Sequence, residues 1–348
     1  MDRRMFIGSM ALAGLGAALG GCATTLPQAA ADRPAPLNVA DFTVAVSEIH
    51  DAEGVATAPD GRLFLSSMTS AVAVRATDGA IRHIGAPLAP TGIAVDSQGR
   101  VLVANMGLLN NGPGPLQRVD IATETVETLV SELEGRALVA SNSPIAARDG
   151  TIYCSHTSWG PIVNIGTTDP AGFIYRVAPD GKADIVARRL RGVNGLCLDA
   201  GDRYLYASLT AEGRIVRFRR MADGSLGPRE DYGPVLGTVV PDHQARDIRA
   251  ISGPERGALG YCDGIAFDTA GWLWVTLPFS NRIVAIAPDG ARAVDIVHDP
   301  EGKAIVVPTN LCWGGTDRRD LYIACRGNGT IIRARSEAVG LPMANWPA

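Results

Sequence analysis

The chain lacks a long run of basic residues. Its 36 acidic residues outnumber its 32 lysines and arginines, and the formal net charge is −4. Charge-driven binding to nucleic acid or to an anionic membrane surface needs clustered positive charge. We therefore expect neither nucleic acid nor a membrane surface as a partner of the folded part of the chain.

Cysteines at metal-binding spacing are also missing. None of the six cysteines belongs to a Cys-x-x-Cys pair, so a zinc site built on thiolates is not expected. Cys22 lies in the leader segment, and the other five cannot all pair within the chain. We expect Cys197 and Cys312, which take the same place in non-neighbouring repeats, to be buried small hydrophobic side chains rather than a disulfide.

No apolar run is long enough to span a bilayer. The run from Met5 to Leu19 contains several glycines and is shorter than the roughly 20 residues that a spanning helix needs. We interpret residues 1–22 as an export signal. Arg3-Arg4 resembles a twin-arginine signal, which directs export of folded proteins, and Leu19-Gly-Gly-Cys22 resembles a bacterial lipobox.

This leader predicts a bacterial cell-envelope protein on the periplasmic side. Cys22 would become the lipid-bearing first residue of the mature chain, and that anchor would be the only membrane contact. An ordinary cleaved signal with an incidental cysteine is the alternative. Residues 23–41, rich in alanine and proline, are expected to form a flexible tether ahead of one folded domain over residues 42–340.

A short pattern that recurs six times is the main signal of the fold. Each copy opens with a polar residue, continues as a short apolar run, turns through Pro, Asp or Gly, and returns as a second apolar run. One copy runs from Glu53-Gly-Val-Ala-Thr through Pro-Asp-Gly to Leu-Phe-Leu-Ser66. We call the opening residues the openers: Glu53, Thr91, Asn142, Asn194, Asp263 and Asn310.

The spacing of the openers predicts an all-β, six-bladed β-propeller. The steps between them range from 38 to 69 residues, which suits blades joined by loops of variable length. Further strand-like segments such as Gly172–Val177 follow, so we expect about four antiparallel strands per blade. The strand around Phe42–Ile49 should complete a blade with strands of the C-terminal repeat, because ring closure protects both edges.

In this fold the openers should surround one mouth of the central channel, since each begins the innermost strand of its blade. The second strand of each blade returns to the same face. The loops Asn105–Pro115 and His156–Gly172 are therefore expected at the mouth, together with the long segment Leu236–Tyr261 as a lid or specificity loop.

Carboxylates and amides that converge in one channel predict a cation site. A buried carboxylate is costly unless something neutralises it, and oxygen ligands from Glu, Asp and Asn suit a hard divalent ion. Ca²⁺ is the leading candidate, with Mg²⁺, Mn²⁺ and Zn²⁺ as the others. We assign Glu53, Asn194 and Asp263 as ligands. Hydrogen bonding of these side chains to the channel wall is the alternative.

These motifs resemble the SMP-30/gluconolactonase/luciferin-regenerating-enzyme-like family of six-bladed propellers. The resemblance rests on Glu53-Gly54, Asn142, Asn194-Gly-Leu196 and Asp263-Gly264, and covers roughly residues 45–335. It implies that Glu53, Asn194 and Asp263 bind the metal, that Asp263 is also the catalytic carboxylate, and that Asn142 holds the substrate or a water molecule on the metal.

The sequence departs from that family in blade three. Ala140 stands where sugar-lactone members often have Arg, and Asn142-Ser-Pro144 replaces the usual Asn-Asp-Gly. These changes tilt the expected substrate toward a more hydrophobic lactone or ester, while a sugar-acid lactone, the commoner substrate that the resemblance implies, stays open as the alternative. Three aromatic residues near the mouth could supply an apolar wall, with core packing as the alternative: Trp159, Phe279 and Trp313.

The predicted function is metal-dependent hydrolysis of a lactone or ester as a small-molecule substrate. The metal would polarise the carbonyl and Asp263 would accept the proton of the attacking water. His156 is a second catalytic candidate, with a solvent-facing loop histidine as the alternative. Asn142, Asn105 and Asn310 are candidate substrate contacts. Two alternatives remain: a non-catalytic periplasmic binding propeller and a metal-free enzyme resembling strictosidine synthase.

Overall fold

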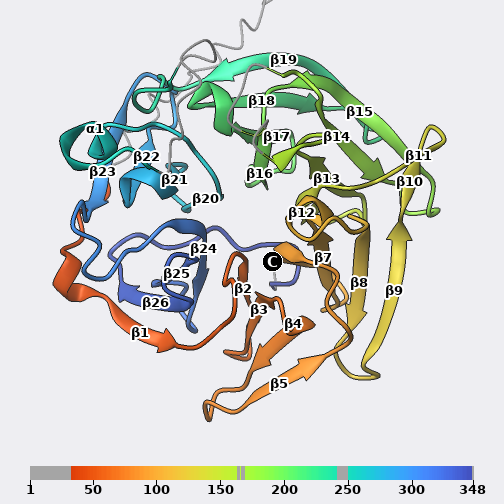
Figure 1. Ribbon diagram of the computed structural model, residues 1–348, viewed down its shortest axis with the longest axis horizontal. Coiled ribbons are helices and arrows are strands. Elements are labelled where there is room, and N and C mark those ends of the chain that lie inside the picture. The colour runs from red at the N-terminus through yellow and green to blue at the C-terminus, as the bar shows by residue number, and fades with distance from the viewer. Residues whose placement is uncertain (1–32, 163–164, 166–168, 241–249, 347–348) are drawn as a thin grey trace, which may run out of the picture. The chain divides into compact units, whose positions relative to one another are not determined.

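Six four-stranded antiparallel sheets surround a central channel in the described part of the chain, as a six-bladed β-propeller (Figure 1). The computed structural model describes residues 33–162, 165, 169–240 and 250–346. The interpretations made for residues 1–22, including Cys22 and the twin arginines, lie outside this range. Within the described residues no helix has the length and apolar character needed to cross a membrane.

The first three blades follow one another along the chain, each numbered from the channel outward. Blade one holds β2 (Val55–Thr57), β3 (Leu63–Ser67), β4 (Ser70–Arg75) and β5 (Ile81–Ile84). Blade two holds β6 (Pro90–Val95), β7 (Val101–Asn105), β8 (Leu116–Asp120) and β9 (Thr125–Val130). After the hairpin β10 (Glu132–Leu133) and β11 (Arg136–Ala137), blade three holds β12 (Ser141–Ala146), β13 (Ile152–His156), β14 (Gly172–Val177) and β15 (Ala183–Leu190).

The remaining blades complete the ring. Blade four holds β16 (Val193–Leu198), β17 (Tyr204–Leu209), β18 (Arg214–Arg220) and β19 (Leu226–Tyr232). Blade five holds β20 (Ile265–Phe267), β21 (Leu273–Leu277), β22 (Arg282–Ile286) and β23 (Ala293–His298). Blade six holds β24 (Pro308–Gly314), β25 (Asp320–Cys325), β26 (Thr330–Arg335) and β1 (Thr43–Val46). The helical elements are short: η1 (Val39–Asp41), η2 (Gly107–Leu109), η4 (Thr210–Glu212), α1 (Gly253–Gly257) and η7 (Pro278–Ser280).

Blade six is built from both ends of the folded chain. The N-terminal strand β1 pairs antiparallel with β26, with Thr43 opposite Arg333 and Val44 opposite Ile332. The strand expected around Phe42–Ile49 therefore does complete the last blade. Because β1 covers the outer edge of β26, both ends of the folded chain are held in one sheet and the ring is closed.

The cores lie between neighbouring blades. The two inner strands of a blade are buried on both faces, as in β3 and β7, whereas outer strands such as β9 have several exposed residues. Fully buried strands read as short apolar runs, which explains why the repeat was visible in the sequence. All five cysteines of the described part are free and buried, as expected for Cys197 and Cys312.

The glycine that follows an opener lets the inner strands approach closely. A Cβ atom on Gly54 would lie 2.4 Å from the Thr91 carbonyl oxygen, and one on Gly195 would lie 2.5 Å from the Asp263 carbonyl oxygen. Only glycine fits such an approach of two backbones. Blade three has Ser143 at this place, where its hydroxyl accepts a hydrogen bond from the Leu196 amide of blade four at 3.2 Å.

A belt of hydroxyl groups joins the blades at the same level. In each case a Ser or Thr hydroxyl donates to the carbonyl oxygen of a residue at the start of the next inner strand. The donor and acceptor pairs are Thr91 to Asn142, Ser155 to Asn194, Ser208 to Asp263, Thr276 to Thr309, and Thr309 to Glu53, at distances between 2.6 and 3.2 Å.

This belt corrects the register of the sixth repeat. The carbonyl of Thr309, and not that of Asn310, takes the hydroxyl of the preceding blade. Thr309 is therefore the opener of blade six, and Asn310 occupies the place that glycine takes elsewhere. Blades two and six have Ala104 and Ala324 where other second strands carry the hydroxyl. Their openers are threonines, which supply the missing hydroxyl themselves.

Candidate active site

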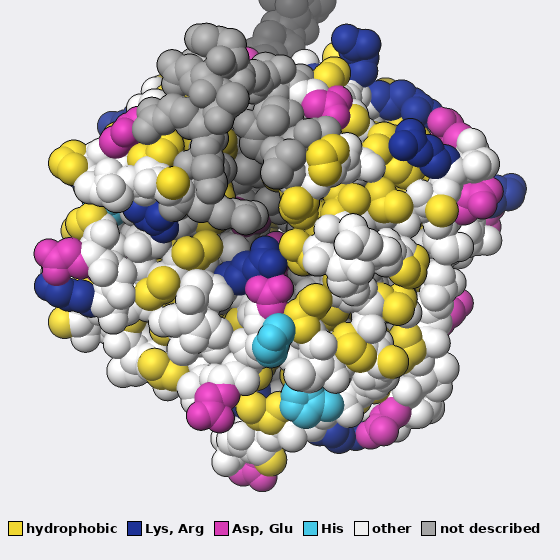
Figure 2. All heavy atoms as spheres, in the orientation of Figure 1, with side chains coloured by type: hydrophobic (Ala, Val, Ile, Leu, Met, Phe, Trp, Pro, Cys, Tyr) yellow, Lys and Arg dark blue, Asp and Glu magenta, His cyan; other side chains and the backbone are white. Residues whose placement is uncertain are grey.

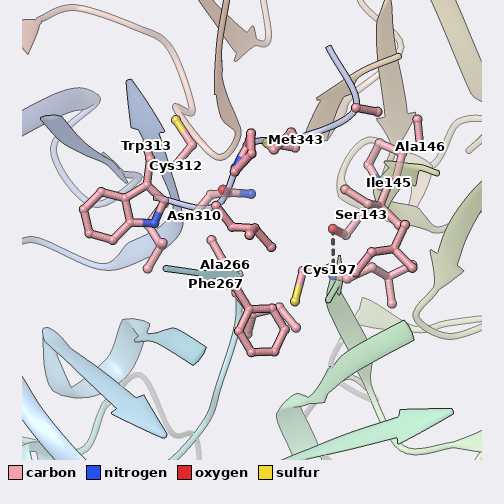
Figure 3. A pocket seen from close by; sticks show the side chains of 18 of the residues that line it. Ser143, Ile145, Ala146, Cys197, Ala266, Phe267, Asn310, Cys312, Trp313 and Met343 are labelled. Carbon is pink, nitrogen blue, oxygen red and sulfur yellow. Dashed lines mark hydrogen bonds between the residues drawn. The ribbon is translucent and has the colours of Figure 1, made fainter. Parts of the chain in front are cut away.

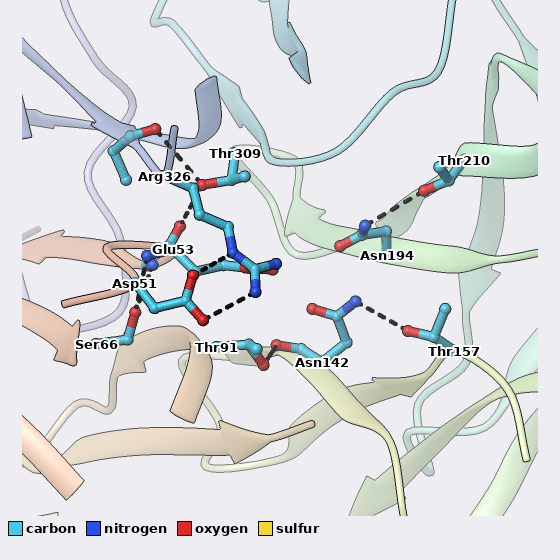
Figure 4. A network of polar contacts seen from close by, with 12 residues as sticks. Asp51, Glu53, Ser66, Thr91, Asn142, Thr157, Asn194, Thr210, Thr309 and Arg326 are labelled. Atoms are coloured by element: carbon cyan, nitrogen blue, oxygen red, sulfur yellow. Dashed lines mark hydrogen bonds and ion pairs between the residues drawn. The ribbon is translucent and has the colours of Figure 1, made fainter. Parts of the chain in front are cut away.

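Polar side chains from five blades meet at the mouth of the channel, and Figure 4 shows those from blades one, three, four and six. Glu53 precedes β2, Asn142 and Asn194 are second residues of β12 and β16, and Asp263 precedes β20. Arg326 follows the last residue of β25 and reaches into the same space. Figure 2 shows basic and acidic side chains side by side near the centre of this face.

Arg326 is held by two carboxylates. Its Nε and Nη2 donate to the two oxygens of Asp51, the second at 2.9 Å, in a paired arrangement. Its Nη1 lies 2.7 Å from Oε2 of Glu53. Such two-pronged contacts fix the plane of a guanidinium as well as its position. The Arg326 side chain is 30% exposed, so the group can be reached from the mouth.

Two threonines orient the amide groups of the ring. Nδ2 of Asn194 donates a hydrogen bond to Oγ1 of Thr210 at 3.3 Å. The hydroxyl of Thr210 in turn donates to the Cys262 carbonyl oxygen at 2.8 Å. Nδ2 of Asn142 donates to Oγ1 of Thr157 at 2.9 Å. Both amide nitrogens are thus turned toward the channel wall, and both amide oxygens face the channel (Figure 4).

The carboxyl groups of Glu53 and Asp263, which open blades one and five, both have raised pKa values. Burial raises the pKa of Asp263 well above its usual value, and the nearby Glu53 charge raises it further, against smaller effects of Arg326 and a hydrogen bond from Asn194. Burial also raises the pKa of Glu53, while Arg326 lowers it. When ionised, the three carboxylates Asp51, Glu53 and Asp263 exceed the single guanidinium by two negative charges.

This donor set fits a divalent cation. Among the described residues no three His, Cys, Asp or Glu side chains are grouped to hold a metal ion. The ring instead offers the carboxylates of Glu53 and Asp263 with the amide oxygens of Asn142 and Asn194, all hard oxygen ligands of the kind that Ca²⁺ and Mg²⁺ prefer. One divalent ion would also neutralise the two excess negative charges.

His156 lies away from the ring, inside the blade. It is fully buried, stacks on Phe173 with ring centroids 4.4 Å apart, and contacts Trp159. Its Nε2 accepts hydrogen bonds from the amides of Val139 and Ala140. Burial lowers the pKa of His156 to about 3. These contacts occupy the lone pair that a catalytic base would use, so His156 is not placed to act as the base.

Asn105 also points into its own blade. Its Nδ2 donates to the Pro115 carbonyl oxygen and to Oε1 of Gln117, both at 3.1 Å, which closes the loop between β7 and β8. The mouth segment Leu236–Tyr261 is described only at its two ends. There Val240, Leu259 and Tyr261 form a small apolar cluster, with Phe279 packed against it.

Asn310 lines a different space, deeper in the channel. A cavity of about 80 Å³ lies between the inner strands of all six blades. Figure 3 shows Asn310 with Trp313, Phe267, Cys197 and other apolar residues around it. The C-terminal tail closes this end, since Leu341 donates its amide to the Phe267 carbonyl at 2.9 Å. Trp313 therefore packs far from the mouth, and Trp159 packs on His156.

Sequence reasoning missed Arg326 and its partner Asp51. The signal was present, because Arg326 comes sixteen residues after Asn310, as Thr210 does after Asn194. The second strand of each blade returns to the mouth face, so a side chain at its end lies there as the loops do.

Comparison with known proteins decides the family. A family model described as the SMP-30/gluconolactonase/LRE-like region matches residues 52–326, which is most of the chain. The chain belongs to the SMP-30/gluconolactonase/LRE-like family. The expected resemblance and the expected fold are both confirmed. The matched range ends at Arg326, so all five residues of the ring lie inside this SMP-30/gluconolactonase/LRE-like region, whereas β26 and β1 of blade six lie outside it.

Two curated relatives are similar over part of their length. The chain is 23% identical over 255 residues to a gluconolactonase from Zymomonas mobilis, covering 72% of this chain and 64% of that protein. It is 26% identical over 195 residues to a 6-deoxy-6-sulfogluconolactonase from Pseudomonas putida, covering 56% and 54%. The aligned part thus spans less than two thirds of each relative.

Solved structures of the family share the fold. A calcium-binding protein, regucalcin, from Agrobacterium tumefaciens superposes with a TM-score of 0.65, at 18% identity, over 90% of this chain and 99% of that one. Identity this low supports the common propeller architecture of the SMP-30/gluconolactonase/LRE-like family. Chemistry must be argued from the residues of the ring, because one fold can carry several functions.

Proposed function

We propose that this protein is a metal-dependent lactonase that opens a cyclic ester at the channel mouth. The observation that carries the proposal is the ring itself, in which the buried Glu53 and the half-buried Asp263 interact beside two amide oxygens turned into the channel. A binding surface has no need of poorly solvated carboxylates that repel each other. Pairs of carboxylates with raised pKa values cluster at functional sites, because placing two such charges together destabilises the fold unless a ligand or a reaction requires them.

The names of the relatives support the choice of substrate class. The two curated relatives are called gluconolactonase and 6-deoxy-6-sulfogluconolactonase, and the regucalcin structure is described as calcium-binding. We therefore propose Ca²⁺ as the metal, held by Glu53, Asn194 and Asp263 with Asn142 beside them. A sugar-acid lactone is the first substrate to test, and an aryl lactone is the second, because blade three departs from the family pattern at Ala140.

The residues of the ring would act as follows. A divalent cation, when bound, would polarise the carbonyl oxygen and make water in the site more acidic. Asp263 takes a proton from water as the water oxygen attacks the carbonyl carbon. The bond between that carbon and the ring oxygen then breaks. Asp263 returns the proton to the leaving oxygen, so that one water and one lactone give one hydroxy acid.

The test is metal content and turnover in the same preparations. The full-length protein and its Asp263→Asn variant are analysed for bound metal, before and after chelation, and assayed against gluconolactone and an aryl lactone. Asp295→Asn is the matched control, since Asp295 lies exposed on β23 of the same blade. We expect chelator-sensitive hydrolysis that falls about 10² to 10⁴-fold in Asp263→Asn and is unchanged in the control.

Other outcomes reject the proposal. Hydrolysis that persists at full rate without metal would favour a metal-free enzyme on the same fold. Metal binding without turnover of any lactone would favour a binding propeller. Full activity of a metal-loaded Asp263→Asn would remove Asp263 as the base.

We also propose that the protein is anchored in the cell envelope through Cys22, after export through the twin-arginine route. The support is the sequence of the leader alone. Labelling with a radioactive fatty acid tests the anchor: wild type should be labelled and recovered with membranes, and Cys22→Ser should be unlabelled and released. A wild-type protein without label would reject the anchor.

A further inference from the structure

The guanidinium of Arg326 is only partly used by the contacts that hold it. An arginine carries five N–H groups. Asp51 takes the Nε group and one group of Nη2, whereas Nη1 lies 2.7 Å from Oε2 of Glu53 as an ion pair in which this oxygen accepts no hydrogen bond. Within the described part of the chain, the other three N–H groups have no hydrogen-bond partner.

The free N–H groups face the channel. In Figure 4 the guanidinium lies between the Asp51 carboxylate and the amide side chains of Asn142 and Asn194, whose oxygens point toward it. Glu53, on one flank of the guanidinium, is also a proposed metal ligand. An oxygen atom of a substrate that entered the ring would therefore lie between this open edge and the cation.

The position of the guanidinium is fixed before any substrate arrives. Asp51 takes a left-handed backbone conformation, with φ of 60°, two residues before Glu53. The Arg326 amide donates to the Val307 carbonyl oxygen at 3.1 Å, which ties the end of β25 to the start of blade six. A donor that needs no rearrangement is the kind that stabilises developing charge most effectively.

We propose that Arg326 is a catalytic residue that binds the carbonyl oxygen of the substrate, and that Asp51 is the positioning residue that holds it. This inference rests on the proposed lactonase function. When water attacks the carbonyl carbon, the carbonyl oxygen gains negative charge, and two N–H groups of Arg326 donate to it. When the ring bond breaks, the same edge contacts the product carboxylate, whose paired oxygens match a guanidinium.

A simpler role for Arg326 would be to neutralise the charge of Glu53, and the experiment must distinguish this role from catalysis. A residue that only balanced the charge of Glu53 would change stability and metal binding when removed, and would leave the rate of the chemical step alone. A residue that donates to the reacting oxygen would lower kcat in protein that still holds its metal. The two roles therefore separate in measurements made on the same sample.

The experiment compares Arg326→Gln, Arg326→Lys and Asp51→Asn with wild type in the full-length protein. Ca²⁺ binding is measured by calorimetry with the metal alone, kcat and KM with the best lactone of the panel, and folding by thermal denaturation. Arg217→Gln is the matched control, because Arg217 pairs with Glu230 on the outer strands of blade four.

We expect Arg326→Gln to bind one Ca²⁺ and to lose about 10² to 10³-fold in kcat, as other enzymes do when one oxyanion donor is removed. Arg326→Lys should recover only part of the rate, since ammonium supplies the charge without the planar fork. Asp51→Asn should lower kcat by a smaller factor, and the control should match wild type.

Three results would overturn the inference. One is a metal-loaded Arg326→Gln with kcat within threefold of wild type. Another is loss of metal together with activity, which would place Arg326 in the metal site instead. If Arg326→Gln does not fold, the decision passes to Asp51→Asn and Arg326→Lys, and unchanged kcat in both rejects the role. A wild-type protein without lactone turnover is a separate result, because it rejects the proposed function itself.

Discussion

Thr210 fixes the direction in which Asn194 presents its amide. Oγ1 of Thr210 donates to the Cys262 carbonyl oxygen at 2.8 Å, so it can only accept from Nδ2 of Asn194, at 3.3 Å. The amide oxygen of Asn194 is left facing the channel. A wall residue thereby decides which atom a proposed ligand offers to a cation.

Thr210→Val should weaken metal binding. Valine has nearly the same shape but accepts no hydrogen bond, so the amide of Asn194 loses its preferred orientation. Residues that orient ligands typically account for about 10 to 100-fold in metal affinity, and we expect about tenfold here, measured by Ca²⁺ titration calorimetry. Thr125→Val, on exposed strand β9, is the control. Equal affinity in both variants would contradict the orienting role.

Metal binding should release protons and tighten as the pH rises. Burial and the charge of Glu53 raise the pKa of Asp263 in the metal-free protein, whereas a metal ligand must be ionised. The apparent affinity should therefore fall as the pH decreases through that raised pKa. Calorimetry in two buffers of different ionisation enthalpy counts the protons released. A heat that is independent of the buffer near neutral pH would argue against this coupling.

His156 should make the protein sensitive to acid. Its pKa is lowered from 6.5 to about 3 in the folded state, so the unfolded chain binds the proton more readily. Stability contributed by neutral His156 is present above about pH 6.5 and is lost as the pH falls toward 3, on the order of several kcal/mol in total.

The comparison that tests this is His156→Gln, which keeps a hydrogen-bond acceptor and does not titrate in this range. Its free energy of unfolding should change less than that of wild type between pH 7 and pH 4.5. The outer-strand variant His83→Gln serves as a control, because His83 is exposed on β5. Identical pH profiles for wild type and His156→Gln would exclude His156 as the cause.

The hydroxyl belt predicts that one small substitution lowers the stability and that a second one leaves it nearly unchanged. Ser208→Ala removes the donor to the Asp263 carbonyl oxygen and should cost about 1 to 3 kcal/mol of stability, because a buried carbonyl loses its partner. Ala104→Ser adds a hydroxyl in blade two, where Thr91 already donates, and should bring no comparable gain. Denaturant unfolding of both variants checks this, and equal effects would contradict the belt as a paired network.

Much of the fold could be read from the sequence, because the inner strands are buried on both faces and each begins with a polar residue. Glu53, Asn142, Asn194 and Asp263 were placed at one mouth on that basis. The register of blade six was missed by one residue. In blade six the hydroxyl comes from Thr309 on the first strand, because the second strand has Ala324 where most blades have Ser or Thr. This change of strand can be recognised only when the pairing of the two strands is known.

Side-chain direction accounts for the other differences. His156 ends a strand at the mouth face, yet its ring turns into the core between Trp159 and Phe173. Asn105 likewise turns into its own blade. Strand position gives the face of the sheet on which a residue lies, but packing against neighbouring blades selects among the allowed rotamers. The pairing of Arg326 with Asp51 could not be predicted from the sequence because Asp51 lies 275 residues away in the chain, and only the fold brings the two together.

The pairing of β1 with β26 has a consequence for how the protein forms. These strands are separated by nearly the whole folded chain, so the contact that closes the ring has one of the largest sequence separations in the molecule. Contacts of this kind form slowly, because a long loop must be ordered first. Blades one to five can assemble while the chain grows from the ribosome, but the last sheet must wait until β26 has emerged. Until then, both ends of the row of blades remain available to pair with another chain.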